Sequence, residues 1–169
     1  MKMLALILLS TGLTAFLAGA QEGGAPVPAD EPVIKVINFT ADWCPNCRIV
    51  DPRIDEAIAR FPDGEIELVE LDMTDTKRAG DEKKLRVFAD AIRLADRHQA
   101  GYLWDWYGGV TGLSAIISAD NGEPISCINR ALSVDEIEFR LNEAKILTLK
   151  APAGRRKPRG PDCPPPMKG

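Results

Sequence analysis

Two cysteines three residues apart, Cys44 and Cys47, are the residues of this sequence best suited to chemistry. They lie in the segment 43–47, Trp-Cys-Pro-Asn-Cys, between an apolar run and a helical pattern that begins at Arg48. Cys44 would therefore lie at the N-terminus of a helix, where unpaired backbone N–H groups and the helix macrodipole favour a thiolate. Cys47, one turn further on, is placed to attack a mixed disulfide formed on Cys44. The pattern predicts a redox-active dithiol, with a purely structural disulfide as the alternative.

The two remaining cysteines, Cys127 and Cys163, are distant from this pair and from each other in the sequence. In an oxidising compartment they could form a second disulfide that pins the end of the chain across the sheet. The alternative is one small buried thiol and one exposed thiol. A zinc site is not expected, because the chain has one CxxC and a single histidine, His98. We therefore predict no metal site and no cofactor.

The first twenty of the 169 residues have the pattern of a cleavable secretory signal. Lys2 supplies a positive charge, residues 4–18 form an apolar stretch, and Ala18 and Ala20 form a small-residue cleavage site ahead of Gln21. The alternative, a membrane anchor, would need about 20 apolar residues, and this stretch is shorter. The pattern predicts a periplasmic or secreted protein, so that the dithiol would work in an oxidising environment.

Composition divides the rest of the chain into a linker, one domain and a tail. Residues 21–32 are rich in Gly, Ala and Pro and predict a flexible linker, whereas residues 33–149 have the length of one ordinary domain. Residues 150–169 are basic and rich in proline, which predicts a disordered tail that either solubilises the protein or touches an anionic surface. The net charge of −4 gives no indication of nucleic-acid binding.

Hydrophobic periodicity within residues 33–149 predicts alternating strands and helices. Strands are expected at 33–40, 65–72, 113–118 and 125–130, and helices at 48–61, 81–99 and 134–147. Pro52 is expected to kink the first helix, and Ser133 with Glu136 to form a capping box at the start of the last one. The aromatic segment 102–107 either forms a substrate-contacting rim beside the cysteines or packs against the helix expected at 81–99.

This order of elements, with a CxxC after the first strand, resembles the thioredoxin superfamily over about residues 33–147. The matching residues are the segments 39–48, 121–123 and 131–133 and Pro52 at the usual kink position. Segments 41–44 and 71–74 most resemble the soluble C-terminal domain of the transmembrane thiol:disulfide interchange reductases. The resemblance implies an α/β fold: a thioredoxin-like three-layer sandwich with a mixed four-stranded sheet and a helical segment inserted before the third strand. It also implies an exported thiol:disulfide oxidoreductase, acting as a reductase on protein thiols and disulfides and supplied by a membrane electron donor.

The chain departs from this family at the position of a buried acid. Asn38 stands six residues before Cys44, where thioredoxins usually carry a carboxyl that helps to deprotonate the second cysteine. An amide cannot take a proton. Proton transfer from Cys47 would then use water or another carboxylate, for which Asp51 and Glu70 are the candidates.

A second departure lies in the loop that should face the cysteines. Ser114 stands where the family has a cis-proline, and a cis bond before a serine would cost about 3 kcal/mol. A trans peptide and a reshaped substrate groove are therefore expected. By the resemblance, Trp43, Pro45, Leu113 and Ser114 are the residues expected to contact a substrate.

Two other functions remain open for the same residues. The chain could be a binding module of thioredoxin fold, in which the rebuilt groove holds a partner and the CxxC is only structural. Alternatively, the dithiol could handle a soft metal such as Cu(I), because loss of the cis-proline can open a CxxC to such ions.

Overall fold

A computed structural model describes residues 31–158 and 163–167; the expected signal peptide and nearly all of the expected linker lie outside these residues. The elements in chain order are β1 (Ile34–Thr40), α1 (Cys47–Ile58), β2 (Ile66–Asp72), the short 3₁₀ helix η1 (Thr74–Thr76), α2 (Asp81–Arg97), α3 (Tyr102–Tyr107), β3 (Leu113–Ser118), β4 (Pro124–Asn129) and α4 (Val134–Lys150). The predicted strands and long helices are all present, with ends that differ from the prediction by at most three residues.

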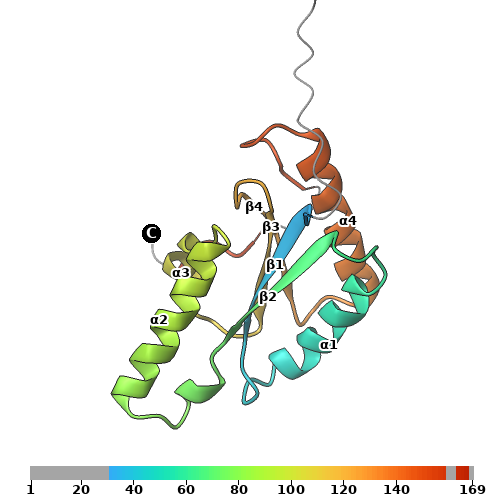
Figure 1. The fold of residues 1–169 in the computed structure, drawn as a ribbon. Coiled ribbons are helices and arrows are strands. Elements are labelled where there is room, and N and C mark those ends of the chain that lie inside the picture. The colour runs from blue at the N-terminus through green and yellow to red at the C-terminus, as the bar shows by residue number, and fades with distance from the viewer. Residues whose placement is uncertain (1–30, 159–162, 168–169) are drawn as a thin grey trace, which may run out of the picture.

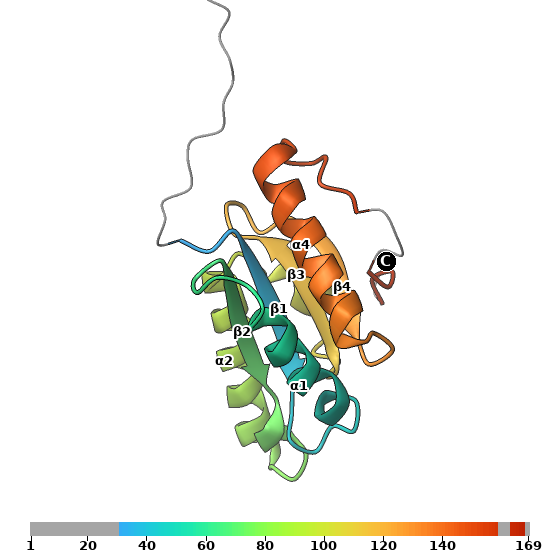
Figure 2. The same ribbon diagram turned by 90° about the vertical axis from the view of Figure 1, so that its right-hand side faces the viewer.

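The strands form one mixed sheet in the order β2-β1-β3-β4. The first strand is parallel to β2 and antiparallel to β3, and β4 is antiparallel to β3. Helices α1 and α4 cover one face and α2 and α3 the other, as Figure 1 and the turned view in Figure 2 show. This is the predicted three-layer thioredoxin-like sandwich, with α3 in the segment inserted before β3.

Each face of the sheet has its own hydrophobic core, which explains why β1 is almost continuously apolar. The core under α1 and α4 includes Val36, Ile54 and Leu141. The core under α2 and α3 includes Phe39, Ala95 and Cys127, together with both cysteines of the CxxC. The CxxC is therefore continuous with the α2 and α3 side of the molecule.

Two local predictions can be compared directly with the structure. The side chain of Ser133 accepts a hydrogen bond from the backbone N–H of Glu136, whose carboxylate accepts one in return, so the predicted capping box is confirmed. Helix α1 runs through Pro52 as one element. None of the helices within the described ranges is long and apolar enough to cross a membrane.

The tail differs from the prediction of disorder over its described parts. Residues 151–158 and 163–167 contain no helix or strand, but they contact the domain at several points. Arg156 is only 6% exposed and pairs with Asp120, and Cys163 is bonded to Cys127. The composition of the tail predicted disorder because it is basic and rich in proline; what fixes it to the domain is a disulfide and an ion pair between the buried Arg156 and the exposed Asp120.

Candidate active site

The two cysteines of the CxxC are joined by a disulfide where the sheet passes into α1. Their Cα atoms are 5.3 Å apart, and the backbone N–H of Cys47 donates a hydrogen bond of 3.1 Å to Cys44 Sγ. N–H groups in the first helical turn have no partner within the helix, so this one is free to stabilise negative charge on Cys44 once the bond is reduced. Cys47 Sγ lies 3.9 Å from the carbonyl oxygen of Phe39. The two sulfurs thus have different surroundings, and only Cys44 has a donor that favours a thiolate.

Both sulfurs are buried, and the last residue of the loop 108–112, which we call the covering loop, lies against Cys44. Cys44 is 3% exposed and Cys47 1%. Gly112, the last residue of the loop, has φ +82°, and a Cβ atom added there would lie 2.5 Å from Asn46 Cβ and 3.5 Å from Cys44 Sγ. Its N–H donates a hydrogen bond of 2.9 Å to the carbonyl of Phe39. Only glycine permits this close approach, and sequence reasoning missed Gly112 although a glycine before Leu113 was the available signal.

On the other side of the disulfide, Trp43 is fixed against η1. Its indole N–H donates to the carbonyl of Thr74 at 2.9 Å, and Lys77 Nζ lies 5.6 Å from the centre of its ring. A cavity of about 490 Å³ borders the indole, with Asp42, Arg78 and Lys83 among its other lining residues. Trp43 is half-buried and Pro45 is exposed, so both present surface beside the disulfide.

A chain of buried polar side chains runs behind the cysteines. The Ser114 hydroxyl donates to the amide oxygen of Asn38 at 2.8 Å, and the amide nitrogen of Asn38 donates to Asp51 at 3.1 Å. The Thr40 hydroxyl donates to the other oxygen of Asp51 at 2.5 Å. Asn38 and Ser114 are almost completely buried, so these bonds satisfy groups that would otherwise be costly to bury. The structure thereby brings together three residues that sequence reasoning singled out separately.

Asp51 lies on the same helix as the second cysteine, and its hydrogen bonds tie it to β1. It follows Cys47 by one turn of α1, and it is bonded to the residues on either side of Phe39, whose carbonyl contacts Cys47 Sγ. The described residues contain no cis peptide bond, so Ser114 follows a trans peptide as expected. Its hydroxyl points to Asn38 and not outward.

Glu70, the other carboxylate candidate, lies on β2 opposite Asn38 in the sheet register. Partial burial raises the pKa of its carboxyl above the usual range, and the charges of Asp55, Asp51 and Asp72 raise it further. Within the described ranges no hydrogen bond joins Glu70 to the polar chain. Asp51, but not Glu70, therefore belongs to the hydrogen-bonded site.

Comparison with known proteins agrees with this geometry. The thioredoxin family model matches residues 27–103, which include the CxxC and the elements from β1 through α2. A thioredoxin H-type from Fagopyrum esculentum is 31% identical over 61 residues, or 36% of this chain and 51% of that protein. These matches support a thioredoxin-superfamily protein. It spans about half the length of the curated relative that it matches.

A solved structure is also similar to this chain. The crystal structure of StoA from Bacillus subtilis is 17% identical and aligns with a TM-score of 0.42, covering 66% of this chain and 84% of that one. Among residues 31–158 and 163–167, no group of three or more His, Cys, Asp or Glu side chains is arranged to hold a metal ion.

The aromatic segment 102–107 packs inward. Trp104 contacts Phe39 and Phe88, with ring centroids 6.4 Å and 5.4 Å away. The Tyr102 hydroxyl donates to the carbonyl of Gly122 at 2.8 Å, and burial raises the pKa of this tyrosine above its usual range. Of the two interpretations open from the sequence, these contacts favour packing of α3 over a rim that contacts substrates.

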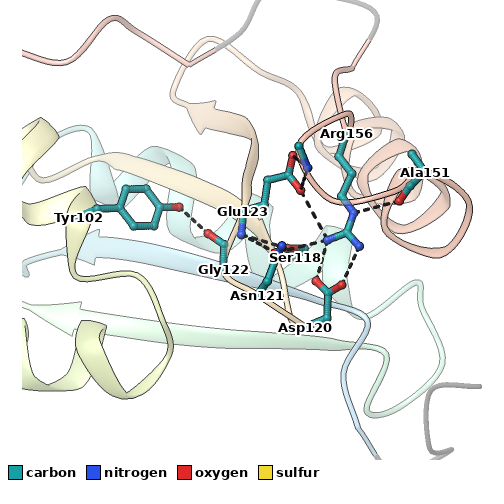
Figure 3. A network of polar contacts seen from close by, with 9 residues as sticks. Tyr102, Ser118, Asp120, Asn121, Gly122, Glu123, Ala151 and Arg156 are labelled. Carbon is teal, nitrogen blue, oxygen red and sulfur yellow. Dashed lines mark hydrogen bonds and ion pairs between the residues drawn. The ribbon is translucent and has the colours of Figure 1, made fainter. Parts of the chain in front are cut away.

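The tail is held at two separate places on the domain. At one of them, shown in Figure 3, both terminal nitrogens of Arg156 lie 2.6 Å from the carboxylate of Asp120, and Arg156 Nε donates to the carbonyl of Ala151. The Arg156 guanidinium holds the pKa of Asp120 below its usual range. Glu123 joins the same network by accepting from the N–H of Gly154 at 2.9 Å.

The second place is the disulfide between Cys127 on β4 and Cys163 in the tail, whose Cα atoms are 4.8 Å apart. Cys127 is buried and Cys163 is half-buried against the same core that contains Cys44 and Cys47. Of the two alternatives left open by the sequence, the structure has the disulfide and not two free thiols.

Proposed function

We propose that this protein is an exported thiol:disulfide oxidoreductase that exchanges disulfides with protein substrates and works as a reductase. The observation that carries the proposal is the Cys44–Cys47 disulfide at the start of α1, with the Cys47 N–H donating to Cys44 Sγ, inside the segment that matches the thioredoxin family. The helix start supplies the electrostatic stabilisation that an attacking thiolate needs.

The reaction starts from the reduced pair. The Cys44 thiolate attacks one sulfur of a substrate disulfide, the substrate S–S bond breaks, and the released sulfur leaves as a thiolate that takes up a proton. Cys47 then loses its proton and attacks Cys44 Sγ, which breaks the mixed disulfide and releases the second substrate sulfur. Two electrons have passed to the substrate, and the Cys44–Cys47 disulfide seen in the structure is the product.

We assign the proton of Cys47 to Asp51, directly or through a water. Hydrogen bonds from Asn38 and Thr40 hold this carboxylate one helical turn from Cys47, so an acid on α1 takes the place of the buried acid that the family carries on the strand. Asp51→Asn should slow the release of reduced substrate from the mixed disulfide about 100-fold at pH 7, the size expected for loss of a general base.

The matched control for this assignment is Glu70→Gln, because Glu70 is the other candidate and lies outside the hydrogen-bonded chain. Rapid-quench measurement of the mixed disulfide should show little change in that variant. A large effect of Glu70→Gln with none of Asp51→Asn would assign the proton to Glu70.

Contact with the substrate is proposed for Trp43, Pro45 and the backbone of Leu113 and Ser114. Trp43 and Pro45 offer surface on one side of the disulfide, whereas the Ser114 side chain is turned to Asn38, which leaves only its backbone for a partner. A substrate must also displace part of the covering loop, because Cys44 is only 3% exposed.

Insulin reduction with dithiothreitol as the electron source tests the proposal. Cys44→Ser should abolish the activity, and Cys47→Ser should accumulate a mixed disulfide with the substrate, because attack can occur without resolution. Full activity in Cys44→Ser would sink the proposal. The pair of variants also identifies Cys44 as the attacking sulfur.

The burial of both sulfurs supports one second candidate, a binding module in which the disulfide is structural. This function predicts a reduction potential too negative for exchange with glutathione, and partner binding unchanged in Cys44→Ala. Equilibration of the Cys44–Cys47 pair with glutathione buffers separates the two candidates in one measurement.

Three further parts of the proposal rest on the sequence: export of the protein, electron supply by a membrane protein, and contact of the basic tail with an anionic surface. Residues 1–20 carry the signal pattern, a reductase in an oxidising compartment needs a membrane protein to supply electrons, and the exposed Arg155 and Lys157 remain available to an anionic surface. Mass spectrometry of the protein isolated from its cells should find Gln21 as the N-terminus.

A further inference from the structure

The end of the tail packs on the C-terminal end of α3. The Tyr107 hydroxyl donates to the carbonyl of Pro164 at 2.9 Å, and the N–H of Met167 donates to the carbonyl of Trp106 at 2.8 Å. The Met167 side chain reaches the next residue, since its methyl carbon lies 3.8 Å from where a Cβ of Gly108 would stand. Residues 163–167 therefore contact the last turn of α3 and the first residue of the covering loop.

The covering loop connects this contact to the redox site. It has five residues, begins at Gly108 directly after Tyr107, and ends at Gly112 against Cys44. Its far end is fixed to Phe39 by one hydrogen bond. Because so short a loop has little slack, the position of the end of α3 limits where Gly112 can lie.

We propose that the Cys127–Cys163 disulfide is a positioning element for the redox site. By tying residues 163–167 to β4, it holds the end of α3 and, through α3, the covering loop over Cys44. Cys163 lies against the same core as Cys44 and Cys47, so the contacts from the tail to the site are continuous. The inference rests on the proposed function only in treating Cys44 as the attacking sulfur; it adds that a second disulfide controls access to that sulfur.

The other attachment of the tail touches α3 at its first residue, where the Tyr102 hydroxyl donates to the carbonyl of Gly122, and not at the end that continues into the covering loop. Arg156 binds Asp120 in the turn between β3 and β4. That turn follows the C-terminal end of β3, whereas the covering loop joins β3 at its N-terminal end. Arg156→Gln is therefore a matched control, because it loosens the tail without removing the hydrogen bonds of Pro164 and Met167 to the end of α3.

The test uses the full chain in a Cys47→Ser background, where Cys44 is the single free thiol and the backbone N–H of residue 47 is kept. Alkylation of Cys44 by iodoacetamide, followed across pH, gives the plateau rate of the thiolate and the pH of half-reaction separately. Adding Cys127→Ala and Cys163→Ala should raise the plateau rate 5- to 10-fold, since the loop covers Cys44 less of the time. The pH of half-reaction should move little, because the N–H donor at the helix start remains.

Two further variants make the outcome decisive. Tyr107→Phe removes only the hydrogen bond to Pro164 and should raise the plateau rate about twofold. If circular dichroism shows that the variant without the disulfide is unfolded, Tyr107→Phe alone tests the proposal. Arg156→Gln should leave the rate unchanged. An unchanged rate in both the disulfide-free and the Tyr107→Phe variants, or an equal rise in Arg156→Gln, would overturn the proposal. Loss of the proposed function would instead show as absent insulin reduction by the wild type, with the alkylation result unaffected.

Discussion

The two disulfides of this protein are the same bond in different surroundings. Cys44 and Cys47 are three residues apart at the start of a helix, and Cys44 Sγ accepts a backbone hydrogen bond there. Cys127 and Cys163 are 36 residues apart and join a strand to the tail. Within the described ranges no hydrogen bond reaches either sulfur of the second pair. A hydrogen-bond donor at the sulfur stabilises the thiolate and so favours disulfide exchange. The length of chain that a disulfide closes sets how much it stabilises the fold.

The largest expected effect is on the free energy of unfolding, to which the two disulfides should contribute unequally. By loop-closure entropy, the 36-residue bridge stabilises the fold by about 4 kcal/mol and the three-residue bridge by about 2 kcal/mol. Cys127→Ala/Cys163→Ala should therefore lower the free energy of unfolding about twice as much as Cys44→Ala/Cys47→Ala. Urea unfolding without reductant measures both. The reverse order would show that the surroundings of the CxxC, and not the chain it closes, dominate its contribution.

A second prediction concerns the close approach of Gly112 to the Cys44–Cys47 disulfide. Gly112→Ala puts a Cβ atom 2.5 Å from Asn46 Cβ at a residue with φ +82°, so the free energy of unfolding should fall by about 3 kcal/mol. Reduction of the Cys44–Cys47 bond should become faster as the loop is pushed away. Thermal unfolding and the rate of reduction by dithiothreitol report the two effects.

The matched control for this prediction is Gly64→Ala. Gly64 has a similar φ of +83° with nothing within 4 Å of the added atom, so only the backbone strain of about 1 kcal/mol remains. Equal losses in the two variants would mean that the close approach of Gly112 to the disulfide contributes nothing.

The smallest effect concerns the tail and its dependence on pH. The hydrogen bonds from Arg156 lower the pKa of Asp120 in the folded protein, so the contribution of this pair to stability is complete above the ordinary aspartate value of about 4. It is lost as the pH falls through the lowered folded value. The difference in urea midpoint between wild type and Asp120→Asn should thus be constant from pH 7 to about 5 and shrink towards pH 3. A difference that grows on acidification would contradict the assigned ion pair.

The sequence was most informative where a signal is local. Capping at Ser133, the strand ends and the dithiol at a helix start all depend on neighbours within a few residues, and the structure has each of them. Asn38 and Ser114 could be recognised as unusual from their positions in a motif. That they bond to each other, and that Asn38 also binds Asp51, could not be predicted, because the partners lie 76 and 13 residues away in the chain.

By itself the sequence determined the strands, the long helices and the Cys44–Cys47 pair, since periodicity and spacing act over a few turns or strands, and its resemblance to the thioredoxin superfamily implied the three-layer fold. Only the tertiary structure decided that Gly112 lies against Cys44, that Asn38 and Thr40 bind Asp51, and that a basic, proline-rich tail is fixed to the domain. Such contacts depend on how distant segments meet in space. Composition describes what a segment prefers alone, and in this tail a disulfide and the ion pair of the buried Arg156 with Asp120 outweigh that preference.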